Sequence, residues 1–424
     1  MTHSATTPAW AENQAEGPKA ATTGNFHDQP PSGPFRAESA DMFKSLFAPK
    51  NAAAIPAPPP ACTCGAPLFR DNTSCIRCGA LVGYLPDRSW LLAFDKAPAR
   101  NNSNTPNASQ TYANPHPALA KRSFKTCTGR AAAHQCNWMI DVTDAATQCL
   151  SCSLTRTIPD LSHPGAPDRW AEAERAKRQT IGQLLRLRLP VRSRHTHPDG
   201  MWFDFLEPLP GTVPVLTGHA DGLITLNLAE ADPARRAQIQ EQMGESFRTL
   251  AGHMRHELAH YYWQLFSQNA EWLQQFRKVF GDERADYAQA LDKHHKQGAP
   301  ANWSSQFISP YASSHPWEDW AETFAHYLHM EEALHTADRL GLDLQRLHLR
   351  TDSFDRASLQ VAGSPALTPA FLHSIDRWVL LSLAANELNA ALGHPHAYPF
   401  IFNPVSVSKL HAVHQSLQKF AAPA

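Results

Sequence analysis

The sequence predicts an α+β protein in which a cysteine-rich region precedes a mostly helical part with a small sheet. Three observations support this. All eight cysteines lie between Cys62 and Cys152. Helical periodicity dominates from about Asp168 onward, and one alternating apolar run around Ile224 is typical of a strand. With 424 residues, we expect three regions: an N-terminal tail over 1–60, a zinc-ribbon region over 61–160, and the main domain over 161–424.

The composition predicts a soluble protein whose overall charge is close to zero. Lys and Arg number 38 against 39 Asp and Glu, so neither a nucleic-acid nor a membrane partner is indicated. The tail is rich in Ala, Pro, Ser and Thr without periodicity, which predicts disorder. No targeting segment opens the sequence, and no long apolar run follows. We expect a cytoplasmic protein.

The eight cysteines form two sets of four, each suited to a structural zinc ion. The first set stands in CTCG and CIRCG, two short loops that can face each other around a tetrahedral site. The second set closes with CLSC but has a less regular first half, and His134 could replace one of its cysteines. Disulfides are the alternative, but thiols stay reduced in the cytoplasm. This region is also a candidate binding site for a protein partner. The sets are Cys62, Cys64, Cys75 and Cys78, then Cys127, Cys136, Cys149 and Cys152.

Further elements follow in order along the chain. An Asn-, Ser-, Thr- and Pro-rich stretch over 97–117 predicts a loop, and an amphipathic helix begins at about Asp168. The runs TVPVLTG and GLITLNL predict strands. The second run is either an edge strand that pairs with an extended substrate or an ordinary sheet strand. Two helices, from about Thr368 and over Pro404 to Phe420, complete the chain.

The central helix carries a metal-binding motif. His256, Glu257 and His260 form the pattern HExxH. Residues four apart lie one turn apart on a helix, so both imidazoles can reach one ion while Glu257 points beside it. Two hydrogen-bonded core histidines are the alternative. A single long helix from Asp232 is predicted, because apolar residues recur at steps of three or four: Ile239, Met243, Phe247, Leu250, Met254, Leu258 and Tyr261.

A second helix offers the third ligand. Ser313 or Ser314 is a candidate N-cap, and Pro316 falls in the first turn. Glu318 and Glu322 share one face of an otherwise aromatic helix, where two buried carboxylates would repel each other without a cation. Glu318 would bind the metal, and Glu322 would accept the ring N–H of a ligand histidine. An exposed acidic face is the alternative. The competing candidates are His326 and His329 for the metal, and Asp282, Glu283, Asp286, His294 and His295 on a predicted surface segment.

This arrangement resembles the gluzincin metallopeptidases related to anthrax lethal factor, in which HExxH is followed by Tyr, by Glu seven residues later, and by Glu four residues after that. Here these positions are Tyr311, Glu318 and Glu322. The resemblance implies a zincin-like domain in which Tyr311 stabilises the oxyanion. From Cys62 onward the chain also resembles bacterial zinc-binding metallopeptidases with an N-terminal zinc-ribbon region, in these stretches: FRDNTSCIRCG, CNWMI, CLSCSLTRTIPDL, GHADGLITLNLAEAD, FRTLAGHMRHELAHYYW, FGDERADYAQAL, HPWEDWAETFAHYLH and NELNAALG.

Together these features predict a zinc metallopeptidase acting on a peptide or protein substrate. His256, His260 and Glu318 would hold one catalytic Zn²⁺, beside one or two structural Zn²⁺ ions. Glu257 would take the proton of the attacking water and deliver it to the leaving amine. The alternative is a catalytically weak or inactive zinc-binding protein that acts as a regulatory or protein-interaction module.

Overall fold

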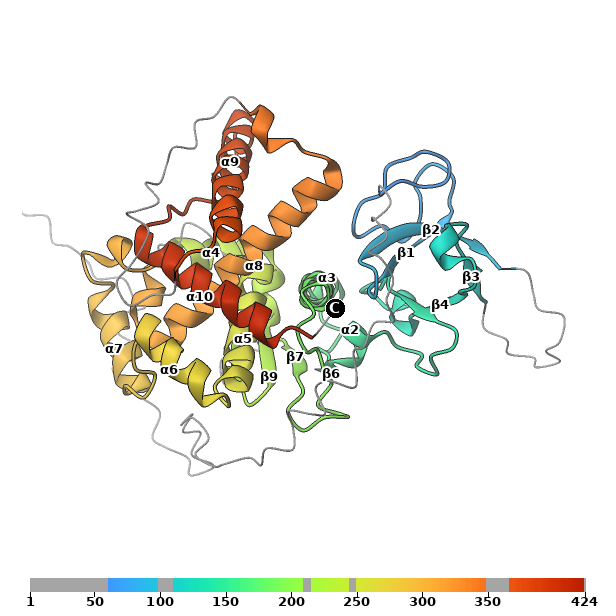
Figure 1. Cartoon of the computed structure of the whole chain (residues 1–424). Coiled ribbons are helices and arrows are strands. Elements are labelled where there is room, and N and C mark those ends of the chain that lie inside the picture. The colour runs from blue at the N-terminus through green and yellow to red at the C-terminus, as the bar shows by residue number, and fades with distance from the viewer. Residues whose placement is uncertain (1–59, 98–109, 209–214, 244–248, 348–365, 423–424) are drawn as a thin grey trace, which may run out of the picture. The chain divides into compact units, whose positions relative to one another are not determined.

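The computed structural model describes residues 60–97, 110–208, 215–243, 249–347 and 366–422 (Figure 1). The predicted tail over 1–60 lies outside them except for Pro60. Within the described residues the fold is α+β, as the sequence predicts: long helices accompany two small sheets.

The first sheet lies in the cysteine-rich region. Its five strands are antiparallel, in the order β1-β2-β3-β4-β5. Strand β3 falls inside the stretch predicted as a loop, where it pairs with both β2 and β4. The loop prediction is therefore wrong for these two residues. The bounds are β1 (Leu81–Leu85), β2 (Trp90–Lys96), β3 (Tyr112–Ala113), β4 (Phe124–Thr126) and β5 (Met139–Asp141).

The second sheet lies beside the motif helix. Its strands run in the order β6-β7-β9-β8, so that β8 forms one edge. The run GLITLNL contains β9, which lies inside the sheet, so the alternative of an edge strand there is wrong and the strand is an ordinary sheet strand. The bounds are β6 (Thr155–Thr157), β7 (Trp202–Leu206), β8 (Gly218–Ala220) and β9 (Leu223–Asn227). In β9, Ile224 and Leu226 are buried and their neighbours are half-buried, as the alternating pattern predicts. Asp221 and Gly222 connect β8 to β9 as a two-residue turn with positive φ angles, typical of a type I′ hairpin.

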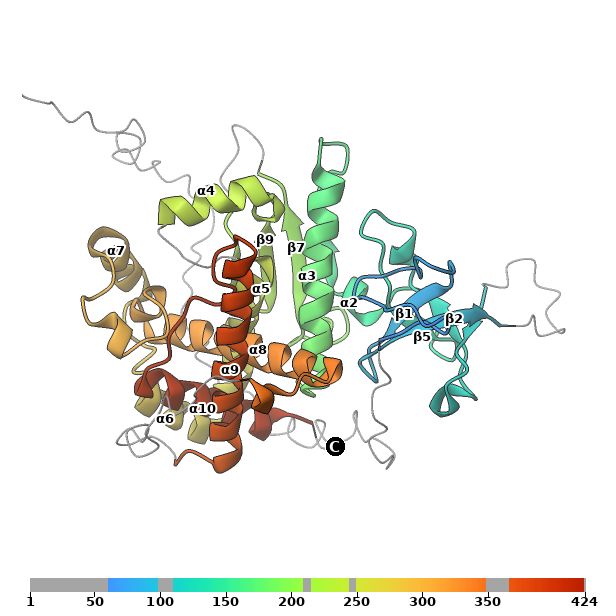
Figure 2. The same cartoon turned by 90° about the horizontal axis from the view of Figure 1, so that it is seen from above.

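Helices build most of the remaining structure. Helix α3 (Ala166–Arg186) packs beside α5 (Leu250–Phe266), which lies along α8 (Pro316–Leu340) (Figure 2). Helix α10 (Pro404–Phe420) crosses α8 and also packs on α6 (Ala270–Val279). The other α-helices are α2 (Leu150–Ser153), α4 (Pro233–Met243), α7 (Tyr287–Gln297) and α9 (Pro369–Ala391), and the 3₁₀ helices are Pro117–Leu119, Thr128–Arg130, Leu228–Ala231, Trp303–Ser305, Tyr311–Ser313 and Leu344–Arg346.

The prediction of one continuous helix from Asp232 to the motif is wrong. Helix α5 begins only at Leu250, because Thr249 has an extended backbone and its side chain accepts a hydrogen bond from the Gly252 N–H. This is the geometry of an N-cap, which starts a new helix. The buried stripe inside α5 does follow the prediction, since Leu250, Met254 and Leu258 are all buried.

Helix α8 begins one residue later than a Ser314 cap implies and two residues later than a Ser313 cap implies. His315 is the N-cap, and its ring accepts a hydrogen bond from the Trp317 N–H. Ser313 instead ends the preceding 3₁₀ helix, where its hydroxyl donates to the Pro310 carbonyl. Both C-terminal helices were predicted correctly, since α9 and α10 begin at Pro369 and Pro404 with Thr368 and Asn403 as caps.

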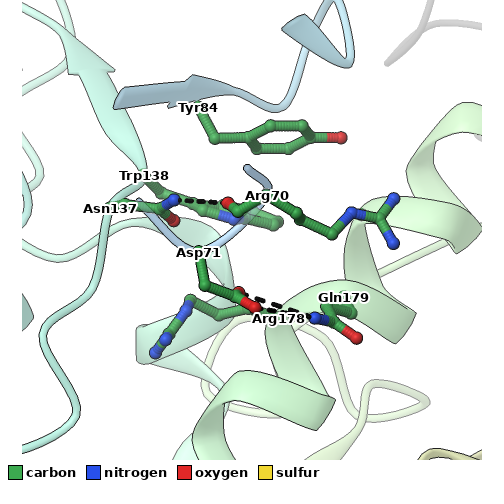
Figure 3. A pocket seen from close by; sticks show the side chains of 8 residues that line it. Arg70, Asp71, Tyr84, Asn137, Trp138, Arg178 and Gln179 are labelled. Carbon is green, nitrogen blue, oxygen red and sulfur yellow. Dashed lines mark hydrogen bonds between the residues drawn. The ribbon is translucent and has the colours of Figure 1, made fainter. Parts of the chain in front are cut away.

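One hydrophobic core joins the cysteine-rich region to the helical part. It includes Cys152 and Trp138 together with Trp170 of α3 and Leu258 of α5. The seam contains a cavity of about 10 Å³, room for roughly one water molecule. In Figure 3, the Asp71 carboxylate faces the Gln179 amide across this seam, at 3.3 and 3.5 Å.

A charged side chain crosses the same seam. Arg70, from the loop between the first and second pairs of cysteines, contacts Glu332 of α8. Within the helical part, Arg186 of α3 contacts both Glu331 and Glu332. None of the helices in the described ranges is both long and apolar enough to cross a membrane.

Candidate metal centre

Two histidines of α5 face each other across the space where a metal would lie. His256 and His260 are one helical turn apart, and their Nε2 atoms are separated by 3.2 Å. The His256 Nδ1 lies 2.8 Å from a carboxylate oxygen of Glu322, which accepts its N–H. That hydrogen bond fixes the tautomer and leaves the Nε2 lone pair of His256 free for a cation.

Glu318 of α8 completes a three-residue group with these histidines. Its Oε2 lies 3.0 Å from the His256 Nε2, and its Oε1 lies 3.6 Å from the His260 Nε2. One ligand atom from each residue falls within 4.8 Å of the others. Glu318 is only 1% exposed, and its Oε2 receives no hydrogen bond from any described residue. A buried carboxylate oxygen without a donor, facing two imidazole nitrogens, fits a zinc ion.

The electrostatics of the group also favour a cation. Burial alone would lower the pKa of His256, but Glu318 and Glu322 on its two sides raise that pKa well above the ordinary value. Burial would raise the pKa of Glu318, but the two imidazoles hold it well below its usual range. The two carboxylates and two imidazoles thus stabilise positive charge at the centre, as binding of a divalent cation requires.

Glu322 is held by a hydrogen bond from outside its helix. The Ser309 hydroxyl donates to its second carboxylate oxygen at 2.6 Å, and the same hydroxyl accepts from the Ala312 N–H. Burial opposes ionisation of Glu322, but the hydrogen bond from His256 lowers its pKa to about 2. Glu322 therefore remains an acceptor for His256, and Ser309 fixes its orientation.

Glu257 and Tyr311, the two predicted catalytic residues, border the group. Glu257 is 9% exposed, and its burial raises the pKa of its carboxyl, which suits a group that must accept and then release a proton. The Tyr311 ring centroid lies 6.0 Å from that of His256. The structure thus brings all six predicted residues of the centre into one place.

The competing ligand candidates have other partners. His326 lies 2.6 Å from the Tyr398 hydroxyl, and His329 accepts a hydrogen bond from Arg255 at 2.6 Å. The acidic residues of the segment before α7 also have structural partners: Asp282 pairs with Arg284, Glu283 pairs with Arg277, and Asp286 caps α7.

Two histidines without a predicted role also find partners beside the centre. His253 pairs with Glu230 at 2.6 Å, which connects α5 to the segment after β9. The ring of His219, on edge strand β8, lies 6.3 Å from that of His260, and its Nε2 accepts from the Gly222 N–H. Burial lowers the pKa of His219 to about 3, so its ring is neutral.

Two residues at the centre were not predicted as site residues. The Tyr287 hydroxyl donates to the Glu318 Oε1 at 2.7 Å, and Ser309 contacts Glu322 as described above. Tyr287 lies in FGDERADYAQAL, one of the stretches that carry the family resemblance, which is the one signal that points to it. Neither residue stands at a motif spacing, because Tyr287 is 31 positions from Glu318 and Ser309 is 13 positions from Glu322. Only the fold brings them there.

The cysteines form two further metal-suited groups, and all eight are free thiols. Sulfur atoms approach within 3.5 Å for Cys62 and Cys78 and within 3.7 Å for Cys136 and Cys149. All four cysteines of the second group are buried, and four buried thiols without disulfides fit a tetrahedral zinc ion.

His134 lies beside the second cysteine group. Its Nε2 is 3.5 Å from the Cys152 sulfur, and Glu174 completes a third set of close ligand atoms with them. The buried Lys177 ammonium already contacts Glu174, at 2.8 Å. We therefore interpret His134 as a hydrogen-bond partner of a cysteine ligand.

Comparisons with known proteins agree with these groups. A family model described as "Putative zinc-binding metallo-peptidase" matches residues 166–416, and a zinc-ribbon domain model matches residues 61–163. Uncharacterized proteins of Mycobacterium bovis and of two strains of Mycobacterium tuberculosis are each 38% identical to this chain over 362 residues, which cover 84% of this chain and 94% of the relative. No solved structure matches the chain.

Proposed function

Because the chain belongs to this zinc-binding metallo-peptidase family, we propose that it hydrolyses peptide bonds at the group formed by His256, His260 and Glu318. The observation that carries the proposal is the geometry of that group. Two imidazoles and a buried carboxylate meet within 4.8 Å, with a second carboxylate behind one imidazole. This donor set is the one that catalytic zinc takes in peptidases.

Each residue has a role that its surroundings support. Zinc, when bound, would polarise the scissile carbonyl and lower the pKa of a water molecule. Glu257 accepts the proton of the attacking water and delivers it to the leaving amine, since its raised pKa suits both steps. Tyr311 donates a hydrogen bond to the oxyanion that develops on the substrate carbonyl.

The spacing of Tyr311, Glu318 and Glu322 after HExxH supports a gluzincin-type centre. The edge strand β8 supports a place for the substrate. Its only partner among the described strands is β9, which leaves the other side of β8 for an extended peptide, and His219 on β8 lies beside His260. A peptide paired with β8 would run past the metal centre.

We further propose that both cysteine groups hold structural zinc and that the protein works in the cytoplasm. The free state of all eight cysteines supports both points. A protein partner bound through the zinc-ribbon region remains a proposal without a defined surface.

The test replaces the proposed general base. In Glu257→Gln the zinc content should equal that of the wild type, because Glu257 is not a ligand, whereas peptide cleavage should fall by at least about 10³-fold. Elemental mass spectrometry measures the zinc, and mass spectrometry of a diverse peptide mixture measures cleavage. Glu271→Gln, which changes an exposed glutamate of α6, is the control and should cleave like the wild type.

Cleavage near the wild-type rate in Glu257→Gln would refute this mechanism. If the wild type itself cleaves nothing while its metal centre is fully loaded, the alternative of a regulatory or protein-interaction module replaces the proposal.

A further inference from the structure

A second tyrosine touches the metal centre directly. The Tyr287 hydroxyl, at the start of α7, donates to the Oε1 of Glu318 at 2.7 Å. The other oxygen, Oε2, faces the His256 Nε2 at 3.0 Å. Tyr287 thus binds the carboxylate oxygen that lies 3.6 Å from the His260 Nε2, and it leaves the other oxygen directed at His256.

Little buried surface other than this contact holds helix α7 against the metal centre. None of its residues is fully buried. Those that are half-buried, Tyr287, Ala290, Leu291 and His294, recur at steps of three, one and three, and so share one face. At the ends of this face Tyr287 reaches Glu318, and the His294 ring centroid lies 5.8 Å from that of Tyr311. The helix therefore presents a single face to the metal centre and to the predicted catalytic tyrosine.

The start of α7 is attached to the start of α8, which carries Glu318. The His315 ring, the N-cap of α8, donates to the Ala285 carbonyl at 3.1 Å, two residues before Tyr287. Asp286 then caps α7 by accepting from the Gln289 N–H. The Tyr287 ring packs 5.2 Å from the His315 ring and 5.6 Å from the Trp317 ring. These contacts fix where the Tyr287 hydroxyl lies before any metal arrives.

We propose that Tyr287 is a positioning residue that holds Glu318 in its metal-binding orientation. This rests on the metal centre of the proposed function but not on peptidase activity. Glu318 is 1% exposed, so bulk solvent does not reach its Oε1 to replace a lost donor. Without the phenol the carboxylate would lose a charge-assisted hydrogen bond and rotate, which weakens it as a ligand.

The two tyrosines then have different roles at the centre. Tyr287 acts on the metal through Glu318 and determines affinity for the ion. Tyr311 acts on the substrate oxyanion and determines turnover. A donor that holds a metal ligand changes metal affinity by about 10- to 100-fold when it is lost, whereas an oxyanion donor changes kcat.

The experiment measures metal affinity in the full-length protein. Co²⁺ is titrated against a competing chelator, and thiolate-to-cobalt charge-transfer bands distinguish the cysteine groups from the His–His–Glu centre. Tyr287→Phe keeps the ring packing and should lower affinity at that centre by about 10- to 100-fold. Tyr311→Phe should leave it unchanged. The control is Tyr327→Phe on the same helix as Glu318, since the Tyr327 hydroxyl contacts His414 instead of the centre.

Wild-type affinity in Tyr287→Phe would overturn the proposal, and so would an equal loss in Tyr327→Phe or Tyr311→Phe. If Tyr287→Phe does not fold, as judged by circular dichroism, Tyr287→Met provides the same test with a flexible apolar side chain. Adding Tyr287→Phe to Glu318→Gln should cause no further loss, because the tyrosine acts through that carboxylate. The titration tests the positioning role of Tyr287 even if the wild type cleaves no peptide.

Discussion

Two hydrogen bonds, through Glu322, connect Ser309 to the ligand histidine His256, so loss of the Ser309 hydroxyl should weaken metal binding. The Ser309 hydroxyl donates to Glu322, which in turn accepts from His256. In Ser309→Ala the carboxylate loses one of its two donors, so we expect metal affinity at the centre to fall by up to about 10-fold. The cobalt titration measures this. Ser305→Ala, which removes an exposed hydroxyl from the neighbouring 3₁₀ helix, is the control. Unchanged affinity in Ser309→Ala would show that Glu322 holds its orientation unaided.

At the residue scale, the centre was predictable wherever its members share a helix. His256, Glu257 and His260 lie within one turn and a quarter of α5, and Glu318 and Glu322 lie one turn apart on α8, so helical periodicity alone sets their relative positions. Ser309 and Tyr287 come from other segments. Their distance to the centre depends on how α7 and the 3₁₀ helices pack, which no local spacing encodes.

At the element scale, the β8–β9 hairpin has a turn that tolerates few substitutions. Gly222 has φ +78°, and a Cβ there would lie 2.6 Å from the Gly200 carbonyl oxygen. Gly222→Ala must therefore move backbone as well as adopt a strained conformation. We expect the free energy of unfolding to fall by about 3 kcal/mol or more.

Gly341→Ala provides the matched control. Gly341 has φ +70° and ψ +29°, in the left-handed region, but no atom lies within 4 Å of the added Cβ. Only the backbone strain remains, so we expect a loss of about 1 kcal/mol. Urea denaturation measures both variants. Equal losses would show that the close approach of Gly200 to the turn does not matter.

The elements themselves were predictable to the extent that local signals determine them. Helical patterning predicted α9 and α10, and apolar periodicity predicted the core face of α5. The break before α5 was not predicted because the apolar pattern in the sequence continues through Phe247. Thr249 caps a new helix, and apolar periodicity alone does not reveal this cap. The short strand β3 was not predicted because its two residues form a strand only by pairing with β2 and β4. Their own sequence carries no strand pattern.

At the scale of the whole molecule, the second cysteine group should support the entire fold. Its four cysteines are buried in the same core as α3 and α5. Zinc binding at such a site contributes to folding directly, so Cys152→Ser should lower the free energy of unfolding by several kcal/mol. Cys78→Ser, in the other group, changes an exposed cysteine and should cost less.

Chemical denaturation followed by tryptophan fluorescence compares the two variants, since Trp320 is buried between α5 and α6. A larger loss in Cys78→Ser would contradict this ranking. The predicted boundary between residues 160 and 161 remains a prediction, although the shared core indicates that the two regions unfold together.

The residue before the first ligand histidine connects three distant segments. Arg255 donates to the Gln183 side chain of α3 and to His329 of α8, and Gln183 donates to the Leu328 carbonyl. Replacing one member alone would leave buried polar atoms without partners. We therefore expect these three positions to be constrained together in evolution. Among relatives they should change together or not at all, and a lineage that has lost the arginine should carry compensating exchanges at the glutamine and the histidine.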